Sequence, residues 1–308
     1  MASGGVWPGP VGATTLGVML PVSERHVFGG TPQYSDILVL GSIAREIGMS
    51  GLWIADHFTY TAKSDQRGSW EAWTLIAALA AAIPDVTIGP MVACTAYRNP
   101  GVIAKMTEMI QDISGGRFIL GLGAGWHKPE YDQFGLPFEP RVSRFEEAIQ
   151  IIHGLIREGK SDFQGRYYQA RSAVNLPRAA SGPATPIMIG SSGDRMFGLL
   201  AKYADAWNTG WYGSTDGIAG KIAKLDAACV AIGRDPVTVV RTAGLAIAQD
   251  GYTGNRPNPF RGSVDETVAF LREFQTLGFR HLCIGLDPFT PESLRAFAPV
   301  VARFNATT

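Results

Sequence analysis

The sequence predicts a (β/α)8 barrel of the TIM type, an α/β fold in which eight parallel strands alternate with helices. Strand-like and helix-like segments alternate along the whole chain, and no second compositional regime interrupts them. A length of 308 residues suits one large barrel of about 250 residues with insertions. We therefore expect a single domain over residues 14–308, preceded by a flexible N-terminal segment at 1–13.

Each predicted strand is a short apolar run bounded by turn-forming residues. The eight runs are residues 14–20, 51–55, 86–92, 118–122, 186–190, 205–208, 237–248 and 280–285. The predicted helices are residues 37–47, 70–83, 102–113, 142–156, 195–203 and 218–231, followed by helices that begin at Ser263 and Pro291. Ser263 and Glu266 form an S-x-x-E capping box, and Pro291 occupies a position where a missing N–H costs nothing.

The helix after Pro140 has the clearest periodicity. Its apolar residues recur at spacings of three and four, namely Val142, Phe145, Ile149, Ile152 and Ile156. Glu146, Glu147 and Gln150 fall on the opposite face, which is typical of an amphipathic helix. Residues 161–184 then break the alternation with a small hairpin and a connector rich in Pro, Ala and Gly. We interpret this segment as a short insertion before the fifth strand.

Charge and composition exclude several partners. Lys and Arg number 27 against 27 Asp and Glu, so no basic surplus indicates a nucleic acid or an anionic membrane surface. The longest apolar run is far shorter than the about 20 residues that span a bilayer. The first 15 residues lack the basic and apolar regions of a secretory leader, and Cys94, Cys229 and Cys283 form no C-x-x-C. We expect a cytoplasmic protein with reduced thiols.

The segment GRFILGLGAGWHKPEYDQF carries the strongest functional signal. A strand that ends in Gly121, Gly123 and Gly125 gives up side-chain packing at its carboxyl end, which makes sense if something must approach the backbone there. In parallel α/β barrels, ligands sit at the carboxyl ends of the strands, here called the barrel mouth. The alternative is a tight strand–helix turn with no ligand.

An Asp–His pair leaves the second strand in the run WIADHF. Asp56 and His57 can bring an imidazole to the barrel mouth, where it would exchange a proton, with Asp56 tuning or orienting it. The alternative is a structural histidine bonded to the backbone. Further ionisable residues expected at the mouth are His127 and Glu130.

A third cluster lies between the fifth strand and its helix. It consists of Gly190, Ser191, Ser192, Gly193, Asp194 and Arg195. Small residues leave backbone N–H groups free at a helix N-terminus, which is a ready anion site, and Arg195 adds a charge-assisted contact to phosphate. A plain helix N-cap is the alternative.

Metal and nucleophile chemistry have little support. The five histidines form neither H-x-H nor H-E-x-x-H, and no G-x-S-x-G elbow is present. We therefore expect no metal site. His281, inside the last strand, is interpreted as a satisfied core histidine.

These motifs resemble the bacterial-luciferase-like superfamily of flavin- and deazaflavin-dependent oxidoreductases, from about residue 16 onward and most specifically over 117–147 and 186–208. The resemblance implies a phosphate-binding turn at 190–195 and a third strand that ends in a bulge, often with a non-proline cis peptide. Met91–Val92 is the candidate bond. It also implies that His57 lies beside the redox-active ring. The loop that carries Gly123, Ala124, Gly125 and Tyr131 would frame that ring.

Together these segments resemble the branch that uses the 5-deazaflavin coenzyme F-420. This resemblance implies hydride transfer between the coenzyme and a small organic substrate, with His57 as proton donor or acceptor. Sugar-phosphate dehydrogenases of this branch carry a glutamate where Trp126 stands, so hexose-phosphate oxidation is not expected. With His127, Trp126 would form a substrate pocket whose flat wall suits an unsaturated or aromatic substrate.

Two alternatives stay open. One is a two-component monooxygenase that uses reduced FMN and oxygen, and the other is a flavin-binding protein without turnover. Arg98, Lys128 and Arg195 near the mouth would meet the anionic glutamyl tail of F-420, which favours the deazaflavin. A homodimer packed through barrel helices and a separate reductase that supplies reduced coenzyme are the expected partners.

Overall fold

The computed structural model describes residues 7, 12–24, 30–62, 65–180, 184–252, 254, 256 and 258–306. Most of segment 1–13, which we expect to be flexible, therefore lies outside the described residues.

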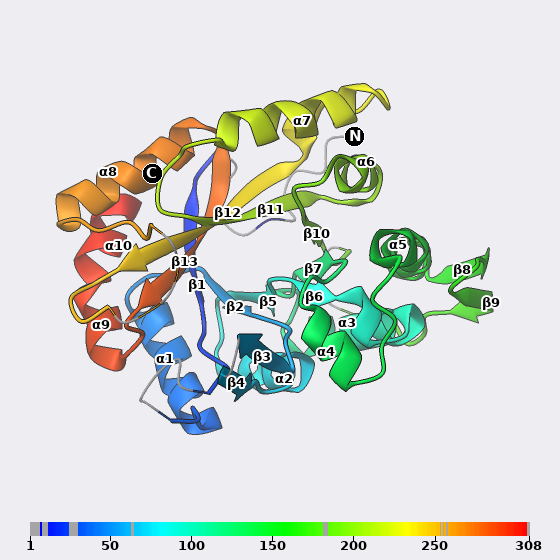
Figure 1. Ribbon diagram of the computed structural model, residues 1–308, viewed down its shortest axis with the longest axis horizontal. Coiled ribbons are helices and arrows are strands. Elements are labelled where there is room, and N and C mark those ends of the chain that lie inside the picture. Colours follow the sequence, from blue (N-terminus) through cyan, green and yellow to red (C-terminus); the bar gives the residue numbers. More distant parts are fainter. Residues whose placement is uncertain are drawn as a thin grey trace.

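The core of the fold is a parallel sheet of nine strands in the order β5-β2-β1-β13-β12-β11-β10-β7-β6 (Figure 1). Its strands are β1 (Thr15–Met19), β2 (Gly51–Ile54), β5 (Thr87–Pro90), β6 (Ala93–Cys94), β7 (Leu120–Gly123), β10 (Ile187–Gly190), β11 (Ala206–Tyr212), β12 (Val240–Ala248) and β13 (Phe279–Asp287). All pairings within this sheet are parallel. Parallel strands joined by helices are buried on both faces, which explains their continuous apolar runs.

The sheet closes because β5 and β6 are one interrupted strand. β5 pairs with β2 and β6 pairs with β7. The N–H of Ile88 donates to the carbonyl of Arg117, and the N–H of Ile119 donates to the carbonyl of Ile88. The nine segments thus fill eight strand positions, and the predicted (β/α)8 barrel is confirmed.

Helices surround the barrel in Figure 1. They are α1 (Tyr34–Glu46), α2 (Ala72–Ala82), α3 (Pro100–Ile113), α4 (Lys128–Gln133), α5 (Arg141–Arg157), α6 (Asp194–Tyr203), α7 (Ile218–Val230), α8 (Val264–Thr276), α9 (Pro291–Ala296) and α10 (Ala298–Asn305). Short 3-10 turns occur at Thr95–Tyr97 and Pro236–Thr238. The predicted apolar face of α5 is buried from Phe145 to Ile156, and the capping box of Ser263 and Glu266 is present.

Several boundaries differ from the prediction. The expected final helix is divided into α9 and α10, and the strand expected at 205–208 continues to Tyr212 as β11. A hairpin of β3 (Thr59–Ala62) and β4 (Asp65–Gly68) follows β2 and was not predicted, because its polar residues lack an apolar alternation. The predicted insertion hairpin is present as β8 (Lys160–Gln164) and β9 (Gln169–Val174), which project beyond α5 in Figure 1.

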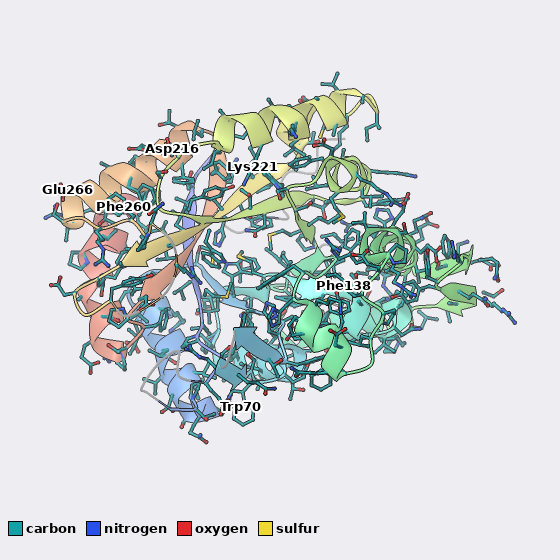
Figure 2. All side chains as sticks on the ribbon, in the orientation of Figure 1. Trp70, Phe138, Asp216, Lys221, Phe260 and Glu266 are labelled. Carbon is teal, nitrogen blue, oxygen red and sulfur yellow. The ribbon has the colours of Figure 1, made fainter. Side chains whose placement is uncertain are left out.

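Side chains fill the space between sheet and helices and the inside of the barrel (Figure 2). A separate cluster occupies the barrel interior and comprises Trp53, Met91, Ile119, Met188, Ala206 and Cys283. Trp7, one of the described N-terminal residues, stacks on Trp53 at a centroid distance of 6.5 Å. The three cysteines are buried and form no disulfide. No helix within the described ranges is long and apolar enough to cross a membrane.

His281 is a core histidine, as predicted. The indole N–H of Trp53 donates to His281 Nε2 at 2.8 Å, and Thr15 Oγ1 lies 2.8 Å from Nδ1. Because Nε2 accepts, the ring carries its proton on Nδ1. Complete burial lowers the pKa of His281 from 6.5 to about 3, so this imidazole is neutral.

Candidate functional site

The loops after β2, β6 and β7 meet at the barrel mouth and bring together aromatic and ionisable side chains. The ring of His57 lies 4.3 Å from that of Tyr60, 5.6 Å from that of Trp126 and 6.2 Å from that of His127, between centroids. Trp126 is 65% exposed and His127 is buried beside it. The structure therefore brings His57 together with the two residues predicted for a substrate pocket.

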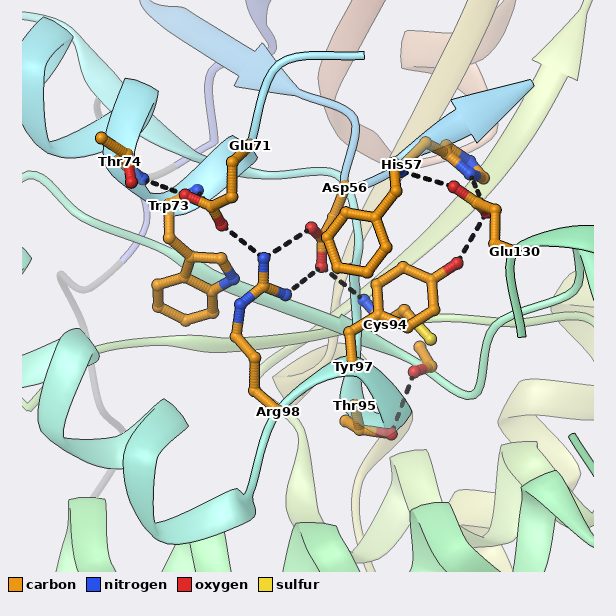
Figure 3. Close-up of polar contacts among 12 residues, drawn as sticks. Asp56, His57, Glu71, Trp73, Thr74, Cys94, Thr95, Tyr97, Arg98 and Glu130 are labelled. Carbon is orange, nitrogen blue, oxygen red and sulfur yellow. Dashed lines mark hydrogen bonds and ion pairs between the residues drawn. The ribbon is translucent and has the colours of Figure 1, made fainter. Parts of the chain in front are cut away.

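The centre of this cluster is a buried carboxylate on α4. Glu130 is completely buried, and its Oε2 lies 2.8 Å from His57 Nδ1 and accepts from the hydroxyl of Tyr97 at 2.6 Å (Figure 3). Its Oε1 accepts from the backbone N–H groups of Phe58 and Thr59. A hydrogen bond from Nδ1–H to Glu130 leaves His57 Nε2 as the nitrogen available to a ligand.

Glu130 is held as an anion. Burial alone raises the pKa of its carboxyl, but hydrogen bonds from His57, Tyr97 and Thr59 and the charge of His57 outweigh burial and leave the pKa below its ordinary value. Sequence analysis placed Glu130 at the mouth without a role. Its partner His57 lies 73 positions away, and no spacing pattern connects the two.

The expectation that Asp56 orients His57 is wrong. Asp56 turns away into the wall, where both oxygens accept from the guanidinium of Arg98 at 2.8 and 3.0 Å and one accepts from the N–H of Cys94 (Figure 3). The reason is geometric, because adjacent residues leaving a strand point to opposite sides. Asp56 thus joins the loop after β2 to the loop after β6, while His57 points to Glu130.

The three cations expected to meet an anionic coenzyme tail are all paired. Arg98 is bound to Asp56 and to Glu71, Lys128 lies 2.7 Å from Asp132, and Arg195 pairs with Glu146. Burial lowers the pKa of Arg98, but the charge of Asp56 and hydrogen bonds to both carboxylates outweigh it and hold the pKa above its ordinary value. Arg98 is therefore a fixed structural cation. The expectation that Arg98 meets the coenzyme tail is wrong.

The interruption of the third strand coincides with a cis peptide between Met91 and Val92, the bond that the family resemblance indicated. The side chain of Val92 faces two of the glycines expected to admit a ligand. A Cβ at Gly123 would lie 2.8 Å from Val92 Cγ2, and one at Gly190 would lie 3.0 Å from the same atom. Val92, in the bulge of the third strand, occupies the space beside both glycines, so this space is not open to a ligand.

The loop after β7 is packed equally tightly. Gly125 has a φ of +78°, and a Cβ there would lie 1.9 Å from the hydroxyl of Tyr131 and 2.7 Å from Cys94 Sγ. That hydroxyl donates to the carbonyl of Ala124 at 2.9 Å. Tyr131 is completely buried and supports the loop after β7 by packing against it. This role differs from the cofactor contact that we expected of Tyr131.

The turn at 190–195 retains the features of an anion site. Gly193 is the N-cap of α6, and no described side chain caps the first turn of this helix. The N–H of Ser191 donates to the carbonyl of Asn208, and the N–H of Gly193 donates to Ser191 Oγ. Nothing among the described residues lies within 4 Å of a Cβ built on Gly193, so the approach to the helix N-terminus is open.

The described residues contain no group of three or more His, Cys, Asp or Glu side chains placed to hold a metal ion. Among the histidines that the structure describes, His57 and His127 lie near one another at the mouth, at 6.2 Å between ring centroids.

A closed parallel barrel with an interrupted third strand, and with its ionisable side chains gathered at the carboxyl ends of the strands, defines a TIM-barrel protein with its ligand-binding end at the mouth. The profile of the luciferase-like monooxygenase family matches residues 14–252. The chain belongs to this family.

Among curated relatives, the pyrimidine monooxygenase RutA of Enterobacter cloacae is 38% identical over 142 residues, which are 44% of this chain and 38% of that protein. RutA of Stutzerimonas stutzeri is 31% identical over 212 residues, which are 66% of this chain and 58% of that protein. The matched part thus spans well under two thirds of the length of these relatives.

Two solved structures show the same fold. An F-420-dependent secondary alcohol dehydrogenase, in complex with an F-420–acetone adduct, superposes with a TM-score of 0.79 at 18% identity, over 95% of this chain and 99% of that one. The EDTA monooxygenase of Chelativorans sp. BNC1 also gives 0.79, at 16% identity, over 96% and 94%. At such identities the likeness concerns the fold alone.

Proposed function

We propose that this chain is the oxygenase component of a two-component flavin monooxygenase, which binds reduced FMN and oxidises a small planar organic substrate with oxygen. Its similarity to pyrimidine monooxygenases, at 31% to 38% identity, supports this function over the deazaflavin-dependent hydride transfer that the sequence motifs favoured. The substrate class that these relatives suggest is a planar nitrogen heterocycle.

The observation that supports the choice of coenzyme is the pairing of the cations. Arg98, Lys128 and Arg195 each have a carboxylate partner, so they present no surplus positive charge to a long anionic tail. Exposed ion pairs are worth about 0–1 kcal/mol, so the contacts of Lys128 and Arg195, which are 59% and 55% exposed, can both be exchanged for a phosphate. Arg195 is the one of the two that lies at the turn 190–195, and it matches the single phosphate of FMN.

The turn at 190–195 fits that phosphate. Its open helix N-terminus offers backbone N–H groups, and Gly193 leaves space beside them. The Met91–Val92 bulge lies on the interrupted strand, which is separated from β10 by β7, and would support the ring of the flavin.

For this reaction, the chain would have to keep water out of the site and exchange a proton with the substrate. Reduced flavin, when bound, supplies two electrons, so that one oxygen atom of O₂ enters the substrate and the other leaves as water. We assign to His57 the exchange of a proton with the substrate at Nε2, while Glu130 holds Nδ1. Trp126 would cover the planar substrate and exclude water.

Hydride transfer with F-420 is the second candidate, since a histidine held by a buried carboxylate also suits a proton exchanged with an alcohol or a carbonyl. A flavin-binding protein without turnover would have little use for such a pair.

The test supplies reduced FMN and reduced F-420 side by side under oxygen, with uracil and its carboxylate derivative orotate as the first substrates. We expect FMN-dependent product that carries one atom from ¹⁸O₂, with one oxygen consumed per product. Substrate oxidation with oxidised F-420 in the absence of oxygen would support the second candidate instead. The reductase and the homodimer are further proposals, the latter checked by sedimentation.

A further inference from the structure

We propose that Arg256, stacked on Trp211 at the barrel mouth, binds a planar carboxylate of the substrate. This inference rests on the proposed function only in placing the substrate at the mouth. It adds that the substrate, or the part of it bound on this side, is an organic anion.

The platform is the ring of Trp211 on β11, which lies over glycines on the two adjacent strands β12 and β13. Trp211 is near the end of β11. A Cβ built on Gly244 of β12 would lie 2.8 Å from its ring, and one built on Gly285 of β13 would lie 3.0 Å from it. Any larger residue at either position would displace the indole. Gly285 shares its strand face with Cys283, a member of the barrel-interior cluster, because residues two apart in a strand point the same way. Trp211 thus lies across the inside of the mouth.

Arg256 comes from the segment between β12 and α8 and covers this platform. The central carbon of its guanidinium lies 4.0 Å from the ring centroid of Trp211, and its Nη1 would lie 2.3 Å from a Cβ on Gly285. Because Nη1 is buried, the edge formed by Nε and Nη2 is the one that can offer two parallel hydrogen bonds to a ligand. That edge matches the two oxygens of a carboxylate.

The guanidinium has no partner among the described residues. Nη1 is buried and makes no hydrogen bond, and no described carboxylate lies within ion-pair distance of Arg256. Burial lowers the pKa of Arg256, which reports the cost of holding this charge away from water. Asp287 acts on this charge only from beyond ion-pair distance, so a bound anion would lower the remaining cost of holding the cation at the mouth.

Arg256 also shares the mouth with the candidate proton-exchanging group. Its charge acts on Tyr60, whose ring is 4.3 Å from that of His57. A planar substrate with its carboxylate on Arg256 would therefore extend from Trp211 towards His57. Arg261, on the same segment, is the contrasting case, since it is exposed and stacks on Tyr252 at 4.8 Å away from this platform.

The test compares benzoate with benzamide, which have the same shape but differ in charge, by calorimetric titration of the full chain without flavin. We expect the parent to bind benzoate at least about tenfold more tightly, the effect of hydrogen bonds to a charged group. Arg256→Gln should lose this preference, Arg256→Lys should retain only part of it because the fork is lost, and Arg261→Gln should leave it unchanged.

A structural role for Arg256 makes opposite predictions. If the side chain only clips its loop to Trp211, Arg256→Met should lower Tm, and benzoate should raise the Tm of parent and variant equally. We expect instead that Arg256→Met has a Tm no lower than that of the parent and that benzoate raises only the parent's. Equal binding of the two probes by the parent, or unchanged preference in Arg256→Gln, would overturn the proposal. Neither readout requires turnover, so failure of the monooxygenase function would be seen separately.

Discussion

His57 Nδ1 lies 2.8 Å from Oε2 of Glu130, although the two residues belong to different βα loops and are separated by 73 positions. The carboxylate is completely buried and receives further donors from Tyr97 and two backbone N–H groups. This pair fixes the orientation of the His57 ring at the barrel mouth.

If His57 exchanges a proton with the substrate, His57→Ala should lower kcat by about 10²–10⁴-fold, the usual contribution of a general acid or base. Flavin affinity should change much less, because the phosphate would be held by the turn at 190–195. The measurement is kcat at saturating substrate together with flavin titration. Weakened flavin binding with normal saturated turnover would show that His57 only packs against the ring.

Glu130→Gln keeps the shape of the side chain but removes the charge that holds His57. We expect kcat to fall, but by less than in His57→Ala, and KM to change little. The double variant with His57→Ala should be no slower than His57→Ala alone, because Glu130 acts through the histidine. Asp132→Asn on the same helix is exposed and serves as control. If the losses of kcat in the double variant were additive, Glu130 would act independently of His57.

The phosphate turn is tested with two flavins. Gly193→Val should weaken FMN binding, since the side chain would block the open helix N-terminus, while binding of riboflavin, which lacks the phosphate, should be unaffected. The backbone at Gly193 has a φ of −94°, so valine is tolerated there.

Gly198→Ala, inside α6 and facing open space, is the control for Gly193→Val. It should leave both flavins unaffected and stabilise the helix by roughly 0.5–1 kcal/mol. Equal loss of FMN and riboflavin in Gly193→Val would move the phosphate site elsewhere.

Acid should destabilise the protein through His281. Its folded-state pKa of about 3 lies below the unfolded value of 6.5, so between these values the unfolded chain binds a proton that the folded chain does not. The contribution of this group is complete above pH 6.5 and is lost at up to about 1.4 kcal/mol per pH unit as pH falls towards 3.

Urea unfolding of the parent and of His281→Gln from pH 7.5 to 5 measures this effect. Glutamine offers an acceptor to Trp53 and a donor to Thr15 without titrating, so the difference between the two proteins should shrink as pH falls. A constant difference would contradict a neutral buried imidazole.

Gly125→Ala should cost well over the roughly 1–2 kcal/mol that a left-handed conformation alone imposes. The added Cβ would lie 1.9 Å from the hydroxyl of Tyr131. Gly135→Ala, also at positive φ but facing open space, should cost only the conformational term. Chemical denaturation compares the two, and equal losses would mean that the loop after β7 relaxes easily.

The sequence predicted the barrel well because apolar runs and helical periodicity are local signals. It could not predict the β3–β4 hairpin, whose residues 59–68 are mostly polar. Nor did the spacing of glycines at 121–125 reveal their use. Gly123 makes room for Val92 and Gly125 for Tyr131, and such packing partners become known only when the strands are placed side by side.

The amino-acid sequence by itself determined the eight strand positions, the amphipathic helices and the gathering of ionisable residues at the ends of β2 and β7. Only the tertiary structure decided the partners within that cluster: Asp56 with Arg98, Glu130 with His57, and Arg256 on Trp211. The physical reason is that hydrogen bonds and ion pairs act over about 3 Å. Barrel closure brings distant loops within that range, and no pattern along the chain specifies which side chain will face which.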